Sequence, residues 1–252
     1  MDDTNLVADR FVAGDVFFFA GSGISYASNL PSAYAVLEHT ANVFLPISIN
    51  NKEKKDICAR IQPEVFYESI IGMTQTYECL DLWRSLYKFE QEKHGLLCSP
   101  NFAHLFIVEY SKKNNLPIIT TNFDSMFEQA CDFLDIKYDI LLPTDSPPVA
   151  DSTVLSICKV HGSIGNMKGE YSPDTLWTTM TQITKVNTKW IKYLNALMAK
   201  KHLCFVGYSG RDIDFFPYIA DFSKKNEVKN IIWINRFNGD YSDIASKVCG
   251  AT

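Results

Sequence analysis

Short apolar runs rich in β-branched and aromatic residues constrain the fold of this chain more than any other feature. Five clear runs and a weaker sixth lie at residues 16–20, 116–120, 154–160, 202–208, 230–235 and, for the weaker one, 138–142. The runs are almost continuously apolar, which is typical of strands covered by helices on both faces. Helical patterns separate them, so we predict an α/β fold with an open, mostly parallel sheet.

The stretch from residue 32 to residue 99 interrupts this alternation. Its patterns are helical throughout, at residues 32–44, 63–73 and 77–93, and it contains no strand pattern. A chain of 252 residues has room for one large α/β domain with an inserted piece. We therefore predict one domain over residues 1–252, with a helical module inserted at about 32–99 between the first two strands.

Charge and hydropathy narrow the range of partners. The formal net charge of −5 gives no general attraction to nucleic acid or to anionic membranes. The N-terminal sequence MDDTNLVADR is acidic and lacks the apolar core of a signal peptide. The run VFFFA is too short to cross a bilayer. We expect a cytoplasmic protein with no direct nucleic-acid or membrane partner.

The cysteine pattern argues against a structural metal. None of the seven cysteines forms a CxxC pair, which is the usual spacing of a zinc knuckle. Several lie inside apolar runs, where a free cysteine behaves as a small core residue. We predict no metal site and a structural role for all seven.

Polar and small residues follow each of the five clear strands. Ligands of open parallel sheets bind beyond the carboxyl ends of the strands. The candidates there, in chain order, are Gly21, Ser22, Gly23, Ser25, Thr121, Asn122, Asp124, His161, Gly207, Ser209 and Asn235. Because all five loops carry such residues, a shared ligand site is favoured over five unrelated turns.

Each loop taken alone has a simpler interpretation. The loop AGSGIS lets backbone approach a phosphate, but Tyr26 stands where a dinucleotide fingerprint has its third glycine. An ordinary strand–turn–helix connection explains the loop equally well. Asn122 and Asp124 fit an Asx turn that leads into a helix.

The histidine and serine candidates have structural alternatives as well. A lone histidine such as His161 is often a buried residue with a structural partner. Ser209 has the side chain of a helix cap. The other four histidines have no strand-end setting, and we interpret them as structural; His104 lies in a helix whose apolar side should be buried.

The order of the loops resembles the sirtuin-like (Sir2-type) family of NAD-consuming domains. The family's Gly-Ala-Gly-x-Ser loop is similar to Gly21–Ser25, and its Asn-x-Asp turn to Asn122–Asp124. Its His-Gly pair is similar to His161-Gly162, its Gly-x-Ser loop to Gly207–Ser209, and its Ile-Asn strand end to Ile234-Asn235. These short motifs run in family order across nearly the whole chain.

The resemblance implies a Rossmann-like fold with NAD+ as substrate and no metal. It implies catalytic roles for Asn122, His161 and Asp124. It also implies that the nucleotide is held by Gly21, Ser22, Gly23, Ser25, Thr121, Gly207, Ser209 and Asn235, with the first loop at the pyrophosphate and Ser209 and Asn235 at the adenosine ribose. The implied reaction is hydrolysis of NAD+ to nicotinamide and ADP-ribose.

Departures from the protein-deacylating pattern refine this expectation. No cysteine pairs follow His161-Gly162, Ser32-Ala33-Tyr34 stands where deacylases carry Asp-Phe-Arg, and Thr121 replaces their glutamine. The chain is similar in this to the divergent bacterial branch, whose members are NAD-cleaving effectors of antiphage (abortive infection) defence. Such effectors are joined to a sensor domain or act with a partner, so we expect control by a sensor or by a homo-oligomer.

Two other classes of function stay open from the sequence. The first is an NAD-dependent protein deacylase or ADP-ribosyltransferase, which requires a groove for an acceptor. The second is a non-catalytic module that senses NAD or ADP-ribose, because catalytic and binding residues overlap.

Overall fold

Parallel strands form the centre of the protein. The structure, a computed structural model, describes residues 3–73, 76–149, 153–165, 175–185, 188–210, 214–225 and 231–234. Within these residues a six-stranded sheet has the order β3-β4-β2-β1-β5-β6, and each neighbouring pair is parallel. The strands are β1 Val16–Ala20, β2 Ile118–Thr120, β3 Tyr138–Leu141, β4 Leu155–Lys159, β5 His202–Val206 and β6 Ile231–Ile234.

The strand order contains a switch point between β1 and β5. From β1 the chain adds β2, β3 and β4 on one side, then crosses over to add β5 and β6 on the other. Because all strands are parallel, their carboxyl ends lie along one edge, and the crevice at the switch point is where open sheets bind ligands.

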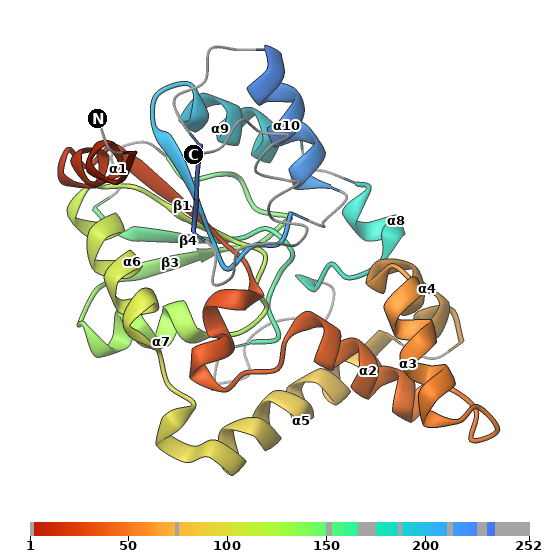
Figure 1. The fold of residues 1–252 in the computed structure, drawn as a ribbon. Helices are drawn as coiled ribbons and strands as arrows, with labels where there is room; N and C mark the ends of the chain where they lie inside the picture. The colour runs from red at the N-terminus through yellow and green to blue at the C-terminus, as the bar shows by residue number, and fades with distance from the viewer. Residues whose placement is uncertain are drawn as a thin grey trace.

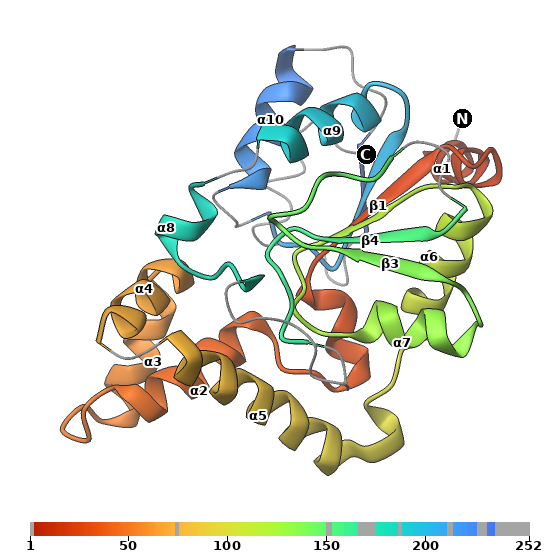
Figure 2. The same ribbon diagram turned by 180° about the vertical axis from the view of Figure 1, so that it is seen from behind.

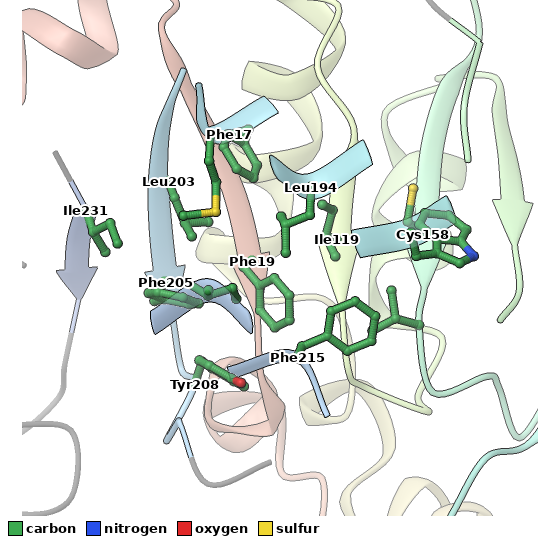
Figure 3. Packing of buried hydrophobic residues seen from close by; sticks show 14 of the residues in the cluster. Phe17, Phe19, Ile119, Cys158, Leu194, Leu203, Phe205, Tyr208, Phe215 and Ile231 are labelled. Atoms are coloured by element: carbon green, nitrogen blue, oxygen red, sulfur yellow. The ribbon is translucent and has the colours of Figure 1, made fainter. Parts of the chain in front are cut away.

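The alternating side chains of β1 explain the three layers of the fold. Phe17 and Phe19 pack in one core against helices on the first face, and Figure 3 shows this core. Val16, Phe18 and Ala20 pack in a second core on the opposite face. The first face is covered by α9 Thr188–Met198 and α10 Phe215–Lys225, and the second by α1 Asp3–Val12, α6 Phe102–Lys113 and α7 Met126–Phe133.

A group of helices between β1 and β2 lies beyond the edge of the sheet where β1 ends (Figures 1 and 2). It consists of η1 Ser22–Ser28, α2 Ala33–Phe44, α3 Asn51–Arg60, α4 Pro63–Met73, α5 Thr76–His94 and η2 Gly95–Leu97. The short helix α8 Met180–Ile183 contacts this group, because Thr181 N donates to Glu68 Oε2 at 3.2 Å. We call α2 to α5 the helical module.

The α/β architecture predicted from the sequence is confirmed. Each predicted apolar run contains a strand, and the weaker run at 138–142 is β3. The three helical patterns expected between residues 32 and 99 are present, while α3 was not predicted. The extent of the domain stays a prediction. Among the described residues, no helix combines the length and apolar character needed to cross a membrane.

Candidate functional site

A buried hydrogen-bond network joins the loop after β1 to the loop after β2. Ser25 Oγ donates to Asp124 Oδ2 at 2.9 Å, and Asn122 Nδ2 donates to Ser25 Oγ at 3.4 Å. His104 Nε2, from α6, lies 3.3 Å from the same hydroxyl. Asp124 Oδ1 accepts from Met126 N at 3.0 Å, so the expected Asx turn is present. Asp124 can therefore form the Asx turn and belong to the shared site, because Oδ1 accepts in the turn and Oδ2 accepts from Ser25.

The direction of these hydrogen bonds follows from the state of His104. Burial lowers the pKa of His104 to about 4, so its ring is neutral near pH 7. Asn101 N donates to Nδ1 of this ring at 3.3 Å, which places the ring proton on Nε2. The Ser25 hydroxyl therefore accepts from His104 and Asn122 while it donates to Asp124, and its hydrogen-bonding capacity is filled.

Asn122 carries an acceptor that this network does not use. The residue is 4% exposed, and its Oδ1 atom has no hydrogen-bond partner among the described residues. Its backbone N–H donates to Thr120 Oγ1 at 3.0 Å, which fixes the main chain at the end of β2. A buried acceptor without a partner is destabilising. The Asn122 carbonyl is thus suited to receive a hydrogen bond from a ligand or from water.

Glycines bring the loops after β1 and β5 into direct contact at the switch point. The N–H groups of Gly21 and Gly23 donate to Val206 O at 3.0 Å and to Gly207 O at 2.9 Å. Gly207 has a φ of +60°, and a Cβ atom there would lie 2.2 Å from Ile24 N. These two amides are therefore used inside the protein. The glycines therefore allow close packing of the two backbones, and these two amides are not available to a phosphate.

His161 follows β4 and pairs with a carboxylate that the sequence analysis did not single out. Its Nε2 atom lies 2.9 Å from Oδ2 of Asp214, which is buried directly before α10. Trp177 N donates to His161 O at 2.8 Å. Gly162 has a φ of +89°, and a Cβ atom there would meet Thr175 O at 1.8 Å. The backbone around His161 is thus held closely by the segment that precedes α8.

The helical module contributes an acidic group near this histidine. Glu64, in the first turn of α4, interacts electrostatically with both His161 and Asp214. Burial raises the pKa of Glu64, while His161 acts in the opposite direction. Glu64 Oε2 is buried and has no hydrogen-bond partner among the described residues. Glu64 is therefore close enough to influence the His161–Asp214 pair electrostatically.

Two neighbouring side chains of α5 attach both site loops to the helical module, one by ring stacking and one by a hydrogen bond. The rings of Trp83, from α5, and Phe123 stack with centroids 5.8 Å apart and an interplanar angle of 20°. Phe123 lies in turn 6.5 Å from the ring of His161. Arg84 Nε donates to Ile164 O at 2.6 Å, and Ile164 belongs to the core of the module. The Asn122 and His161 loops are therefore part of the core that holds the module together.

The structure places ten of the eleven residues singled out from the sequence. Ser25, Asn122 and Asp124 are bonded together, and Gly21, Gly23 and Gly207 form the contact at the switch point. Ser22 and Thr121 are half-buried beside them, Ser209 is exposed, and His161 is joined to Asp214. Asn235 lies outside the described residues.

Sequence reasoning missed three residues of the site, namely His104, Asp214 and Glu64. His104 was expected to be buried, which is confirmed, but its contact with Ser25 was not foreseen. Asp214 had one signal in the sequence, an acidic residue directly before a helix and close to a strand-end loop. In the part of the chain that the structure describes, no group of three or more His, Cys, Asp and Glu is placed to hold a metal ion.

A doubly wound parallel sheet with polar side chains gathered at its switch point defines a protein of the nucleotide-binding α/β class. Residues 117–246, just over half of the chain, match the family model of the SIR2-like domain. The chain therefore belongs to the SIR2-like family, whose members use NAD+. The matched range contains the Asn122–Asp124 turn, His161 and Gly207. A search of curated proteins found no match.

Proposed function

We propose that this protein hydrolyses NAD+ to nicotinamide and ADP-ribose. The observation that carries the proposal is the carbonyl oxygen of Asn122, a buried acceptor without a partner in the described residues, held by a filled hydrogen-bond network. A neutral acceptor in this position suits a ribose hydroxyl or a water molecule. The membership of a family that uses NAD+ supports the choice of substrate.

The chemistry of the bond explains why a neutral amide is suitable. Nicotinamide is bound to the ribose through a positively charged nitrogen, so it leaves with the bonding electrons without prior protonation. The ribose carbon then passes through a state with oxocarbenium character, as in the cleavage of glycosides. The carboxylate of Asp124, buried beside Asn122, stabilises this developing positive charge.

The pair of His161 and Asp214 supplies the proton acceptor in this proposal. A carboxylate bonded to one ring nitrogen orients a histidine and stabilises its protonated form. In this proposal His161, oriented by the contact of its Nε2 atom with Asp214, takes a proton from water or from a ribose hydroxyl. The water oxygen forms the new bond to the ribose carbon as the bond to nicotinamide breaks, and ADP-ribose is released.

We place the rest of the nucleotide at the loops after β1 and β5. Gly21, Ser22 and Gly23 lie against Gly207 at the switch point, and we place the pyrophosphate there. We place the adenosine ribose toward Ser209 and Asn235, as the family resemblance implies. Ser25 contributes by holding Asp124 and Asn122 in place, because its hydroxyl is directed at them. We assign Thr121, whose N–H donates to Ala20 O at 3.1 Å, to the same site.

We further propose that this activity serves antiphage (abortive infection) defence in the cytoplasm. The support is the set of departures from the deacylase pattern, including the absence of CxxC pairs from the sequence. An unrestrained NAD+ hydrolase would drain its own cell. We therefore propose control by a homo-oligomer, by a sensor domain or by a separate sensor protein. That no metal takes part stays a prediction.

One assay separates this function from its alternatives. Purified protein is incubated with NAD+, with and without an acyl-lysine peptide, and free nicotinamide and ADP-ribose are measured. Equal amounts of both products without peptide are expected, and Asn122→Ala should lower their release at least ~10²-fold. Release that depends on the peptide would indicate a deacylase or a transferase. Tight NAD+ binding without any nicotinamide release would indicate a sensing module.

A further inference from the structure

A fully buried lysine lies two residues before His161. Lys159 is the last residue of β4, and its side chain has no exposed surface. Its Nζ atom donates to Glu128 Oε1 at 2.6 Å, to Asp124 O at 2.5 Å and to Ser163 Oγ at 3.1 Å. All three protons of the ammonium group are thus used, each on a different segment of the chain.

These three acceptors connect the two loops that carry the proposed catalytic side chains. Asp124 belongs to the loop after β2, and Ser163 belongs to the loop after β4. Ser163 Oγ also lies 3.3 Å from Phe123 O, to which it donates, and it accepts from Gly165 N at 3.3 Å. Glu128, on α7, anchors the lysine from the second face of the sheet.

Stability alone is a weak reason for an ion pair in this place. Removing two charges from water is unfavourable, and apolar residues of similar volume often replace a buried pair without loss of stability. The pair is also incompletely bonded, because Glu128 Oε2 is buried without a hydrogen-bond partner in the described residues. Burial raises the pKa of Glu128, and the adjacent Lys159 opposes that rise. What the lysine adds is a directional link between two loops.

We propose that Lys159 is a positioning residue, which sets the turn of Asn122 and Asp124 relative to His161 by bonding to both loops at once. The inference rests on the proposed hydrolysis of NAD+. The loops after β1 and β5, where we place the pyrophosphate, make none of the three contacts of Lys159. Loss of the lysine should therefore affect turnover more than substrate binding.

A charge-free pair distinguishes positioning from plain stability. Lys159→Met alone leaves Glu128 unpaired and should lower the melting temperature strongly. The double variant Lys159→Met/Glu128→Leu removes both charges and should recover most of that loss. Its kcat for nicotinamide release should still be at least tenfold below that of the unchanged protein, with the KM for NAD+ changed less than threefold. A double variant that recovers both stability and kcat would overturn the proposal.

Two further variants keep the test decisive if the double variant does not fold. Ser163→Ala removes one of the three contacts without exposing a charge, and it should lower kcat at least threefold. Lys54→Met is the matched control, because Lys54 is a buried lysine of α3 whose Nζ lies 3.5 Å from Asn42 O, away from these loops. It should leave kcat unchanged. Unchanged kcat in Ser163→Ala would contradict the proposal.

A measurement without turnover separates failure of this inference from failure of the proposed function. Amide hydrogen exchange in residues 121–126 and 161–165 should accelerate in the double variant or in Ser163→Ala, and not in Lys54→Met. If the unchanged protein releases no nicotinamide, the proposed function is wrong, and the exchange rates alone decide whether Lys159 holds the loops. Equal exchange in all variants would show that it does not.

Discussion

Ser25 and Asp124, 99 residues apart in the sequence, share a buried hydrogen bond of 2.9 Å between Oγ and Oδ2. The bond connects the end of β1 to the end of β2. The same hydroxyl accepts from His104 and Asn122, so one small side chain orients three others.

Replacing Ser25 by alanine should impair both stability and turnover. The change leaves the N–H groups of His104 and Asn122 without their acceptor, and such losses cost about 2 kcal/mol of unfolding free energy. Turnover should fall at least about tenfold, since Asn122 and Asp124 lose their common anchor. Ser28→Ala is the control, because Ser28 is buried in the same η1 helix and accepts from Asn101 at 3.0 Å. Equal loss of activity in both variants would contradict a specific role for Ser25.

Asn122→Ala and His161→Ala should each lower turnover at least ~10²-fold, the usual scale for a positioned catalytic group. Both residues follow strands rather than lying within them, so circular dichroism should show a retained fold. Replacing the buried His202 by asparagine should not affect turnover per folded molecule, because β5 begins there, at the opposite edge of the sheet. If His161→Ala works at near-normal rate, the histidine is structural and the mechanism is wrong.

Acid should destabilise the protein through His104. The pKa of this residue is about 4 in the folded state and about 6.5 in the unfolded state, so the unfolded chain binds more protons between these values. Its contribution to stability is present above pH 6.5 and is lost as the pH falls toward 4. The full loss is about 3 kcal/mol. Urea unfolding at pH 7.5 and pH 5 gives the change in unfolding free energy for the unchanged protein and for His104→Gln, and the difference between these two changes measures the larger part of the loss. Equal changes in the two proteins would refute the assignment.

Glu64→Gln should shift the acid limb of the pH–rate profile to lower pH. The Glu64 carboxylate interacts with His161, so its removal makes protonation of the histidine less favourable. The neutral, proton-accepting form then persists into more acidic solution. Glu38→Gln serves for comparison, because Glu38 pairs with Lys55 at 3.4 Å on α2 and α3. An unchanged acid limb in Glu64→Gln would show that Glu64 does not influence the protonation of His161 during turnover.

Turnover per molecule should rise with protein concentration if assembly controls the activity. An assembly that fixes the helical module over the site would exclude water and orient the ribose. Specific activity is measured from nanomolar to micromolar protein, alongside the sedimentation coefficient. Full activity at nanomolar concentration in a monomeric species would rule out control by self-association, and addition of a sensor would then be the remaining route.

The sequence predicted the sheet well because its central strands β1, β2 and β4 are buried on both faces. Runs such as 202–208 are almost continuously apolar, which is typical of strands with helices on both faces. The helix α3 was missed because its sequence, NKEKKDICAR, is mostly charged and has little apolar periodicity. Its signal was the capping box of Asn50 and Glu53, in which each side chain bonds the backbone of the other.

The site was predictable only as far as it follows strand ends. Asn122, Asp124 and His161 have that position, and the parallel sheet brings their loops to one edge. The roles of Asp214 and Lys159 cannot be predicted from strand ends, because they depend on packing between segments that are far apart in the chain. The glycines of the first loop were expected to present amides to a phosphate, but two of those amides donate to the last residue of β5 and to the residue after it instead. Only the three-dimensional structure shows which acceptor each of these backbone N–H groups binds.

The stacking of Trp83 on Phe123 has a consequence for anyone who wishes to redesign the chain. From the sequence, the helical module resembles an insertion that could be removed or exchanged. Their core, however, includes Phe123, Ile164 and Leu176, which come from segments that follow β2 and β4. Removal of the module would expose these side chains to solvent and would remove the packing that holds the turns beside Asn122 and His161. The smallest unit that can be grafted onto another scaffold is thus the module together with both turns.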